Sequence, residues 1–102
     1  MAVTVKKGTD DFHSVIAVDG RFTFDVRDQC LAVIDAVPPR ARRITIDLTR
    51  TDYLDSAALG MLIRAREKFK GAQLGLKVKA KSPASEILEV ANFHKMFRYE
   101  AI

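Results

Sequence analysis

Apolar side chains at every second position mark out several short strands along the chain. Such alternation predicts strands at residues 3–5, 44–48 and 74–78. A compact run of mostly β-branched residues at 15–18, followed by an Asp-Gly pair, predicts another strand that is more deeply buried. The chain is therefore expected to contribute at least four strands to a sheet.

The segments between these strands change to apolar spacings of three and four, which predict helices. Such stripes cover residues 24–37 and 56–70. A last helix is expected to begin at Ser82 and Pro83, with the serine as N-cap and the proline in the first turn. A short apolar tail at residues 93–97 follows this helix and is expected to dock on the rest of the fold.

The predicted order of elements is β-β-α-β-α-β-α. Strands that alternate with helices favour right-handed crossovers and a mostly parallel sheet. The first two strands are close enough in sequence to pair antiparallel. We therefore expect an α/β fold with a small, mixed, mostly parallel sheet of four to five strands and helices packed on it, formed by residues 1–102 as one domain.

Composition narrows the class of protein. Of the 102 residues, 48% are apolar and 29% are charged, which is typical of a globular protein with a real core. Cys30 is the single cysteine, so no intramolecular disulfide can form, and we expect it to pack as a small apolar residue. No signal-like segment or apolar stretch of membrane-spanning length is seen, which predicts a cytoplasmic protein.

The sequence lacks the residue patterns that metal binding, phosphate binding, nucleophilic catalysis or nucleic-acid binding would require. His13, His94 and Cys30 have no metal-ligand spacing, no glycine loop suits a phosphate, and Ser56 lacks a nucleophile motif or base. The basic clusters at residues 40–43 and 77–81 lack interleaved aromatic residues. We expect no enzyme activity, metal, cofactor or nucleic-acid partner.

The most informative segment is residues 44–63, ITIDLTRTDYLDSAALGMLI. A buried strand ends at Leu48, a short polar loop follows, and Asp55 and Ser56 stand at the start of the next helix. In open α/β sheets, binding sites form beyond the carboxyl ends of the strands. The loop-to-helix junction around Ser56 is therefore the candidate working surface.

This segment resembles the STAS domain of bacterial anti-sigma factor antagonists. The resemblance rests on residues 46–48 (IDL), followed by residues 53–60 (YLDSAALG) at the start of a helix of small residues. Gly20 and Asp25 also stand where the family tends to have a glycine after the second strand and an aspartate near the first helix. The similarity extends over essentially the whole chain, and the Asp-Ser junction is its most specific part.

The resemblance implies a phosphorylation switch at Ser56. In that family the serine after the aspartate is phosphorylated by a partner kinase, and the unphosphorylated protein binds an anti-sigma factor that is itself a serine kinase of the GHKL type. Phosphorylation ends the binding, and a PP2C-type phosphatase restores it. Many members carry a second hydroxyl residue next, whereas this chain has Ala57, so Ser56 is the only hydroxyl here.

The resemblance also suggests a partner-binding surface made of Asp55, Ser56, Gly60, Met61 and Arg64. Some of these residues have an equally good structural interpretation. Ser56 stands at or next to the helix N-cap, and Asp55 is either a second capping residue or part of the surface read by the kinase. Met61 either contacts the partner or packs on the flank of the helix.

A second function remains open at this point. STAS domains also serve as subunits of signalling scaffolds or of lipid or anion transport complexes, without a phosphorylation switch. In such a protein Ser56 would serve only as a contact or a cap, because a fold alone does not fix a function.

Overall fold

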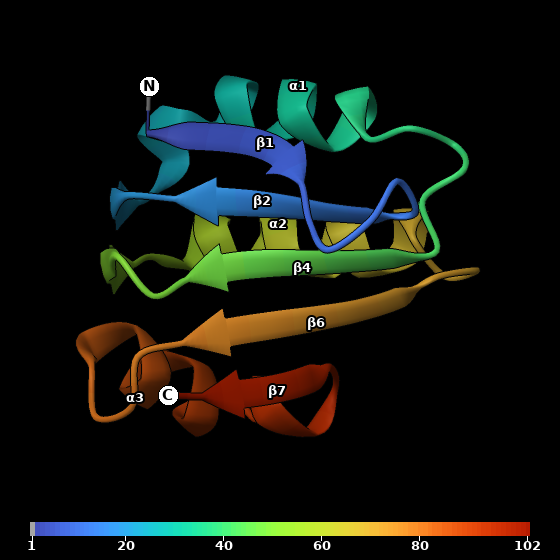
Figure 1. Cartoon of the computed structure of the whole chain (residues 1–102). Coiled ribbons are helices and arrows are strands. Elements are labelled where there is room, and N and C mark those ends of the chain that lie inside the picture. The colour runs from blue at the N-terminus through green and yellow to red at the C-terminus, as the bar shows by residue number, and fades with distance from the viewer. Residues whose placement is uncertain (1) are drawn as a thin grey trace.

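A computed structural model describes residues 2–102, whose centre is a five-stranded sheet in the order β1-β2-β4-β6-β7 (Figure 1). These strands are β1 (Val3–Lys7), β2 (His13–Val18), β4 (Arg43–Leu48), β6 (Gln73–Val78) and β7 (Arg98–Ala101). β1 pairs antiparallel with β2, and the other neighbours pair parallel. The predicted α/β class, the mostly parallel sheet and the antiparallel first pair are confirmed.

Two short strands form a separate parallel pair that the sequence pattern did not predict. They are β3 (Gly20–Phe22) and β5 (Thr51–Leu54). Neither is long enough to show an alternating pattern, since each has three or four residues. Gly20 begins β3 with a positive φ of 83°, a conformation that glycine adopts without steric cost. The pair lies outside the main sheet, and its second strand, β5, directly precedes the second helix.

The helices begin and end close to the predicted positions, with one difference. The segment predicted as one helix over residues 24–37 starts as a 3-10 turn, η1 (Phe24–Val26), and continues as α1 (Arg27–Ala36). Thr23 caps that turn, because its hydroxyl accepts from the Asp25 N–H. The second helix, α2 (Ser56–Lys68), matches the expected start.

The third helix, α3 (Pro83–Val90), follows its predicted capping signals. The Ser82 hydroxyl accepts a hydrogen bond from the Ser85 N–H at 3.1 Å, and Pro83 lies in the first turn. The apolar tail forms the 3-10 turn η2 (Phe93–Lys95) and then the strand β7. Phe93 and Phe97 are buried and stack with ring centroids 5.5 Å apart, so the tail docks as expected.

One core joins the sheet to the helices. The inward residues of β4 and β6 alternate with half-buried or exposed ones, and α2 contributes Ala58, Leu62 and Ala65. Cys30 is buried in α1, and burial raises the pKa of its thiol to about 11. The expectation that Cys30 packs as a small apolar residue is therefore confirmed.

All three α-helices lie on one face of the main sheet. In Figure 1 the sheet faces the viewer, and α2 is visible through the gaps behind β2 and β4. Within the part of the chain that the structure describes, no helix covers the other face, whose residues are largely polar. The molecule is therefore a two-layer structure with one open sheet surface.

The packing predicts that single truncations in the core are costly. Ile46 in β4 is 3% exposed and Leu62 in α2 is 1% exposed. We expect Ile46→Ala and Leu62→Ala each to lower the free energy of unfolding by about 2–5 kcal/mol. Urea denaturation followed by circular dichroism measures this loss. A loss below about 1 kcal/mol for either variant would contradict the packing described here.

Candidate functional site

The approach to α2 is fixed by hydrogen bonds at the carboxyl ends of the strands. After β4, the Asp47 carboxylate accepts from the backbone N–H and the hydroxyl of Thr49, at 2.9 and 2.7 Å. The buried hydroxyl of Thr51 donates to the Val18 carbonyl at 2.7 Å. These bonds hold β5 against the end of β2 and set the direction in which the chain enters α2. They also give Asp47 a structural role as the cap of this turn.

Asp55 is the N-cap of α2 and also a link to a distant segment. One carboxylate oxygen accepts from the Ala58 N–H at 2.9 Å, which satisfies a free donor of the first helical turn. The other oxygen accepts from the Phe24 N–H at 3.0 Å, at the start of η1. Of the two interpretations of Asp55, capping is therefore confirmed, and a role in kinase recognition stays a prediction.

Ser56 occupies the first position inside α2, directly after the cap. Its side chain is exposed, and its hydroxyl has no hydrogen-bond partner within residues 2–102. The expectation that Ser56 is at or next to the N-cap holds in the second sense only, because Asp55 takes the capping role. The hydroxyl is therefore free to react without breaking a bond of the folded chain.

Three of the five predicted site residues lie on one exposed ridge of α2. Ser56, Gly60 and Arg64 lie four residues apart on α2, so they follow one another along one side of the helix, and all three are exposed. Met61 is not on this ridge. It is 5% exposed and packs in the core, so the packing interpretation describes it and it offers no surface to a partner in this conformation.

Exposed apolar residues surround this ridge, and the sequence pattern did not identify them as site residues. Phe24 is 65% exposed at the start of η1, and Tyr53 and Ile63 are also exposed. The Arg21 guanidinium lies 4.7 Å from the centre of the Tyr53 ring, which is a cation–π geometry. The only sequence signal for Phe24 is that it lies off the apolar stripe of the helix that follows.

Arg64 and Lys68 of α2 both interact electrostatically with Asp35 of α1. Lys68 donates to the Asp35 carboxylate at 2.9 Å. This hydrogen bond and the positive charge of Lys68, with a smaller contribution from Arg64, hold the pKa of Asp35 below its usual value. Because all of these groups are exposed, the pairing adds little stability and leaves Arg64 available to a partner.

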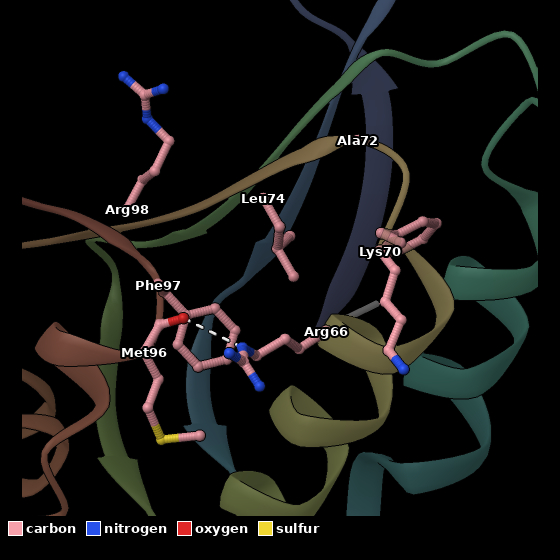
Figure 2. A pocket seen from close by; sticks show the side chains of 8 residues that line it. Arg66, Lys70, Ala72, Leu74, Met96, Phe97 and Arg98 are labelled. Carbon is pink, nitrogen blue, oxygen red and sulfur yellow. Dashed lines mark hydrogen bonds between the residues drawn. The ribbon is translucent and has the colours of Figure 1, made fainter.

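A pocket lies at the C-terminal end of α2, far from Ser56. Figure 2 shows this pocket of about 310 Å³, where the Arg66 Nε donates to the Met96 carbonyl at 3.1 Å beside Phe97 and Leu74. None of the predicted site residues lines it. Its floor is apolar and its basic side chains point in different directions, so they do not form a single charged site.

Residues 2–102 contain neither a metal-binding cluster nor a membrane-spanning helix. No cluster of three or more histidine, cysteine, aspartate or glutamate side chains there has a geometry that would hold a metal ion. No helix in that range has both the length and the apolar character needed to cross a membrane.

The double role of Asp55 predicts a stability difference between neighbouring substitutions. Asp55→Ala removes the cap and the bond to Phe24, and we expect a loss of about 1–3 kcal/mol in the free energy of unfolding. Ser56→Ala should cost about 0.5 kcal/mol or less. The control is Asp52→Ala, an exposed aspartate of β5 whose carboxylate accepts no hydrogen bond within residues 2–102. Equal losses for Asp55→Ala and Asp52→Ala in thermal melts would refute the capping role.

Comparison with known proteins places the chain in a family. Residues 5–98 match the sequence profile of a family described as "Mlab, STAS domain". A STAS-domain containing protein of Pseudomonas aeruginosa is 32% identical over 99 residues, which cover 96% of this chain and 98% of the relative. The match therefore extends over nearly the full length of both sequences.

Solved structures share the fold at lower identity. An anti-sigma factor antagonist from Mycobacterium paratuberculosis superposes with a TM-score of 0.83 at 22% identity, over 98% of this chain and 86% of that one. The unphosphorylated form of the anti-sigma factor antagonist SpoIIAA gives 0.69 at 18% identity, covering 90% and 83%.

A sulfate transporter family protein from Wolinella succinogenes gives a TM-score of 0.72 at 17% identity, covering 95% of this chain and 84% of that one. At these identities the solved structures establish a common fold and no more. The profile and the full-length relative carry the assignment, and the resemblance seen in the sequence is confirmed. The chain belongs to the STAS domain family.

Proposed function

We propose that this protein is an anti-sigma factor antagonist whose partner binding is switched by phosphorylation of Ser56. In its unphosphorylated form it binds a kinase-like anti-sigma factor of the GHKL type through the surface of Ser56, Gly60 and Arg64. The partner kinase phosphorylates Ser56 and ends the complex, and a PP2C-type phosphatase restores it. The chain then acts by binding rather than by catalysis, as a single cytoplasmic STAS domain.

One observation carries the proposal, namely the free hydroxyl of Ser56 beside a cap that is already complete. Because Asp55 satisfies the Ala58 and Phe24 N–H groups, phosphorylation of Ser56 breaks no hydrogen bond. A phosphate at the first position of a helix is favoured by the helix dipole and by the free N–H groups of the first turn. The modified protein should therefore remain folded.

The same modification changes what the surface can bind. Phosphate adds about −1.5 to −2 charges at neutral pH, next to the carboxylate of Asp55. The neighbouring Phe24, Tyr53 and Ile63 are exposed apolar groups that a partner would cover. Covering the phosphate together with these groups removes water from a charged group, which is costly without a counter-charge. Release of the partner follows from this cost, with no need for a change of fold.

The first test is chemical. We expect the protein incubated with its kinase and ATP to gain one phosphate, which tandem mass spectrometry should locate on Ser56. Ser56→Ala should abolish the modification while its circular dichroism spectrum stays unchanged. Phosphate on Thr51 or Ser82 instead, or full phosphorylation of Ser56→Ala, would refute the assignment.

The second test concerns binding. Ser56→Ala should bind the anti-sigma factor as the unmodified protein does, and Ser56→Glu should weaken binding by about tenfold or more. The glutamate carries about half the charge of a phosphate, so the modified protein should bind more weakly still. Asp52→Glu, which keeps the charge of the neighbouring strand β5 unchanged, is the control and should bind normally. Isothermal titration calorimetry with the purified partner measures the affinity of each variant. Equal affinity for Ser56→Ala and Ser56→Glu would contradict the switch.

The interface itself can be tested with Phe24 and Arg64. Phe24→Ala should weaken binding by about thirtyfold, or about 2 kcal/mol, because a large exposed aromatic residue is a typical hot spot. Arg64→Glu should weaken it by about tenfold. Lys95→Glu, which replaces an exposed residue of η2, is the control for altered net charge. Normal affinity for both Phe24→Ala and Arg64→Glu would move the interface away from α2.

A second function remains a candidate because of two similarities to known proteins. The family profile is named for Mlab, and one structural neighbour is a sulfate transporter family protein. In that case the chain would be a STAS subunit of a transport or scaffold complex, without a phosphorylation switch. The two functions differ in one result, since a subunit of this kind would not be phosphorylated on Ser56 by a partner kinase.

A further inference from the structure

The helix-free face of the main sheet is a second surface with a distinct character. Parallel sheets are almost always covered on both faces, because their crossovers place helices there. Here four of the five strands run parallel, yet within residues 2–102 the helices cover one face only (Figure 1). The open face is therefore a surface that a partner protein can cover.

One row of side chains crosses this face from edge to edge. The strand register aligns one residue from each of the five strands, in the order Lys6, Val15, Thr45, Gly75 and Arg98. A cation stands at each end, and three small uncharged residues lie between them. Four steps between neighbouring strands separate the two cations, a backbone span of about 19 Å.

The middle of this row is the floor of a trough. Two adjoining hollows, each of about 420 Å³, share four lining residues, Arg43, Thr45, Lys77 and Glu100. Gly75 keeps the floor low on one side, and Lys6 and Arg98 border the outer ends. Figure 2 shows that Arg98 points to the opposite side of the sheet from Leu74, which belongs to the core. We call this surface, formed by Lys6, Val15, Arg43, Thr45, Gly75 and Arg98, the basic trough.

The wall of the basic trough beside β1 is a rigid, uncharged cluster around His13. The Thr9 N–H donates to the His13 Nδ1 at 3.1 Å, which leaves Nε2 to donate to the Thr45 hydroxyl at 2.8 Å. A side chain at Gly8 would collide with the His13 ring, so the glycine is required for this packing. Burial, and next the charge of Arg43, lower the pKa of His13, while the charge of Asp10 has a smaller, opposite effect. The ring is therefore neutral near pH 7.

The cations of the basic trough have no charged partner in the fold. Among residues 2–102, Lys6, Arg43 and Arg98 form no ion pair, although five other basic residues do. The carboxylates of this face, Asp47 and Glu100, flank Lys77 in the next row and also line the hollows. The three cations of the trough are therefore unpaired, and the charged side chains that line the hollows have a net positive charge.

We propose that the basic trough is a second docking surface, which binds an acidic segment of a partner protein. A partner with two or more carboxylates spaced along an extended or helical segment can reach both Lys6 and Arg98 across the floor formed by Val15, Thr45 and Gly75. Charge complementarity selects the partner, because five cations and two carboxylates line the two hollows and leave a net positive surface. Since it lies on the face away from α2, it can be occupied while the Ser56 surface is bound or phosphorylated.

Other occupants fit this surface less well. Small-molecule sites are enclosed and mostly apolar, whereas both hollows are open to solvent and lined largely by polar side chains. A nucleic acid carries a continuous row of phosphates, which would meet Asp47 and Glu100 as well as the cations. An acidic polypeptide can place its carboxylates only where the cations are.

The test uses deca-glutamate as the acidic probe and deca-glutamine as its uncharged counterpart. The full chain is titrated at about 0.15 M salt, and its backbone amides are followed by NMR. We expect saturable shifts at Thr45, Gly75 and Arg98 with deca-glutamate and none with deca-glutamine. Ser56→Glu should bind the probe with unchanged affinity, so this result does not depend on the proposed switch.

Charge-reversal variants decide whether the site is specific. Lys6→Glu combined with Arg98→Glu should weaken probe binding by about tenfold or more. The combination of Lys81→Glu and Lys95→Glu changes the net charge equally away from the trough and should weaken it by less than about threefold. If circular dichroism shows that the first pair disrupts the fold, Lys6→Gln with Arg98→Gln replaces it, with an expected loss of about threefold to tenfold.

Three results would overturn the proposal. Equal weakening by the two double variants would mean that the probe responds only to net charge. Shifts confined to Arg40 and Arg42 would place the binding on the loop before β4. Displacement of the probe by an equimolar amount of inorganic tripolyphosphate would mean that the trough is a site for small anions.

Discussion

The two oxygens of the Asp55 carboxylate hold together segments that are 31 residues apart in sequence. One oxygen starts α2, and the other fixes the turn η1 that leads into α1. The hydrogen bonds around Thr51 and Asp47 bring the chain to this point, but Asp55 decides where the helix begins. A helix that began one residue later would need the Ser56 hydroxyl as its cap, and the exposed reactive group at the site would then be lost.

Much of this arrangement could be predicted from the sequence, because its signals are local. The alternation in β4 and β6, the stripe of α2 and the Ser82-Pro83 start of α3 each depend on a few neighbouring residues. The three strands β3, β5 and β7 could not be predicted in this way. Each has three or four residues, and their pairing depends on where the rest of the chain brings them.

The candidate site shows the same division between local and distant information. The position of Ser56 near a helix start follows from the residues beside it. The burial of Met61 and the exposure of Phe24 depend on how helices pack, and the spacing of residues along one helix does not reveal this. The capping role of Asp55 was open in the sequence because two adjacent residues, an aspartate and a serine, were both suitable N-caps.

The directions of the outer strands also determine where further polypeptide would emerge. Val3 pairs with Val18, and Ala101 pairs with Val78, so both outer strands have their free ends at the carboxyl edge of the parallel strands. α2 begins at that same edge. A domain fused before Ala2 or after Ile102 would be tethered at the edge where α2 begins, and one with affinity for the Ser56 surface would compete there at a high effective concentration. A fusion designed to leave the surface accessible therefore needs a linker that carries the added domain past this edge.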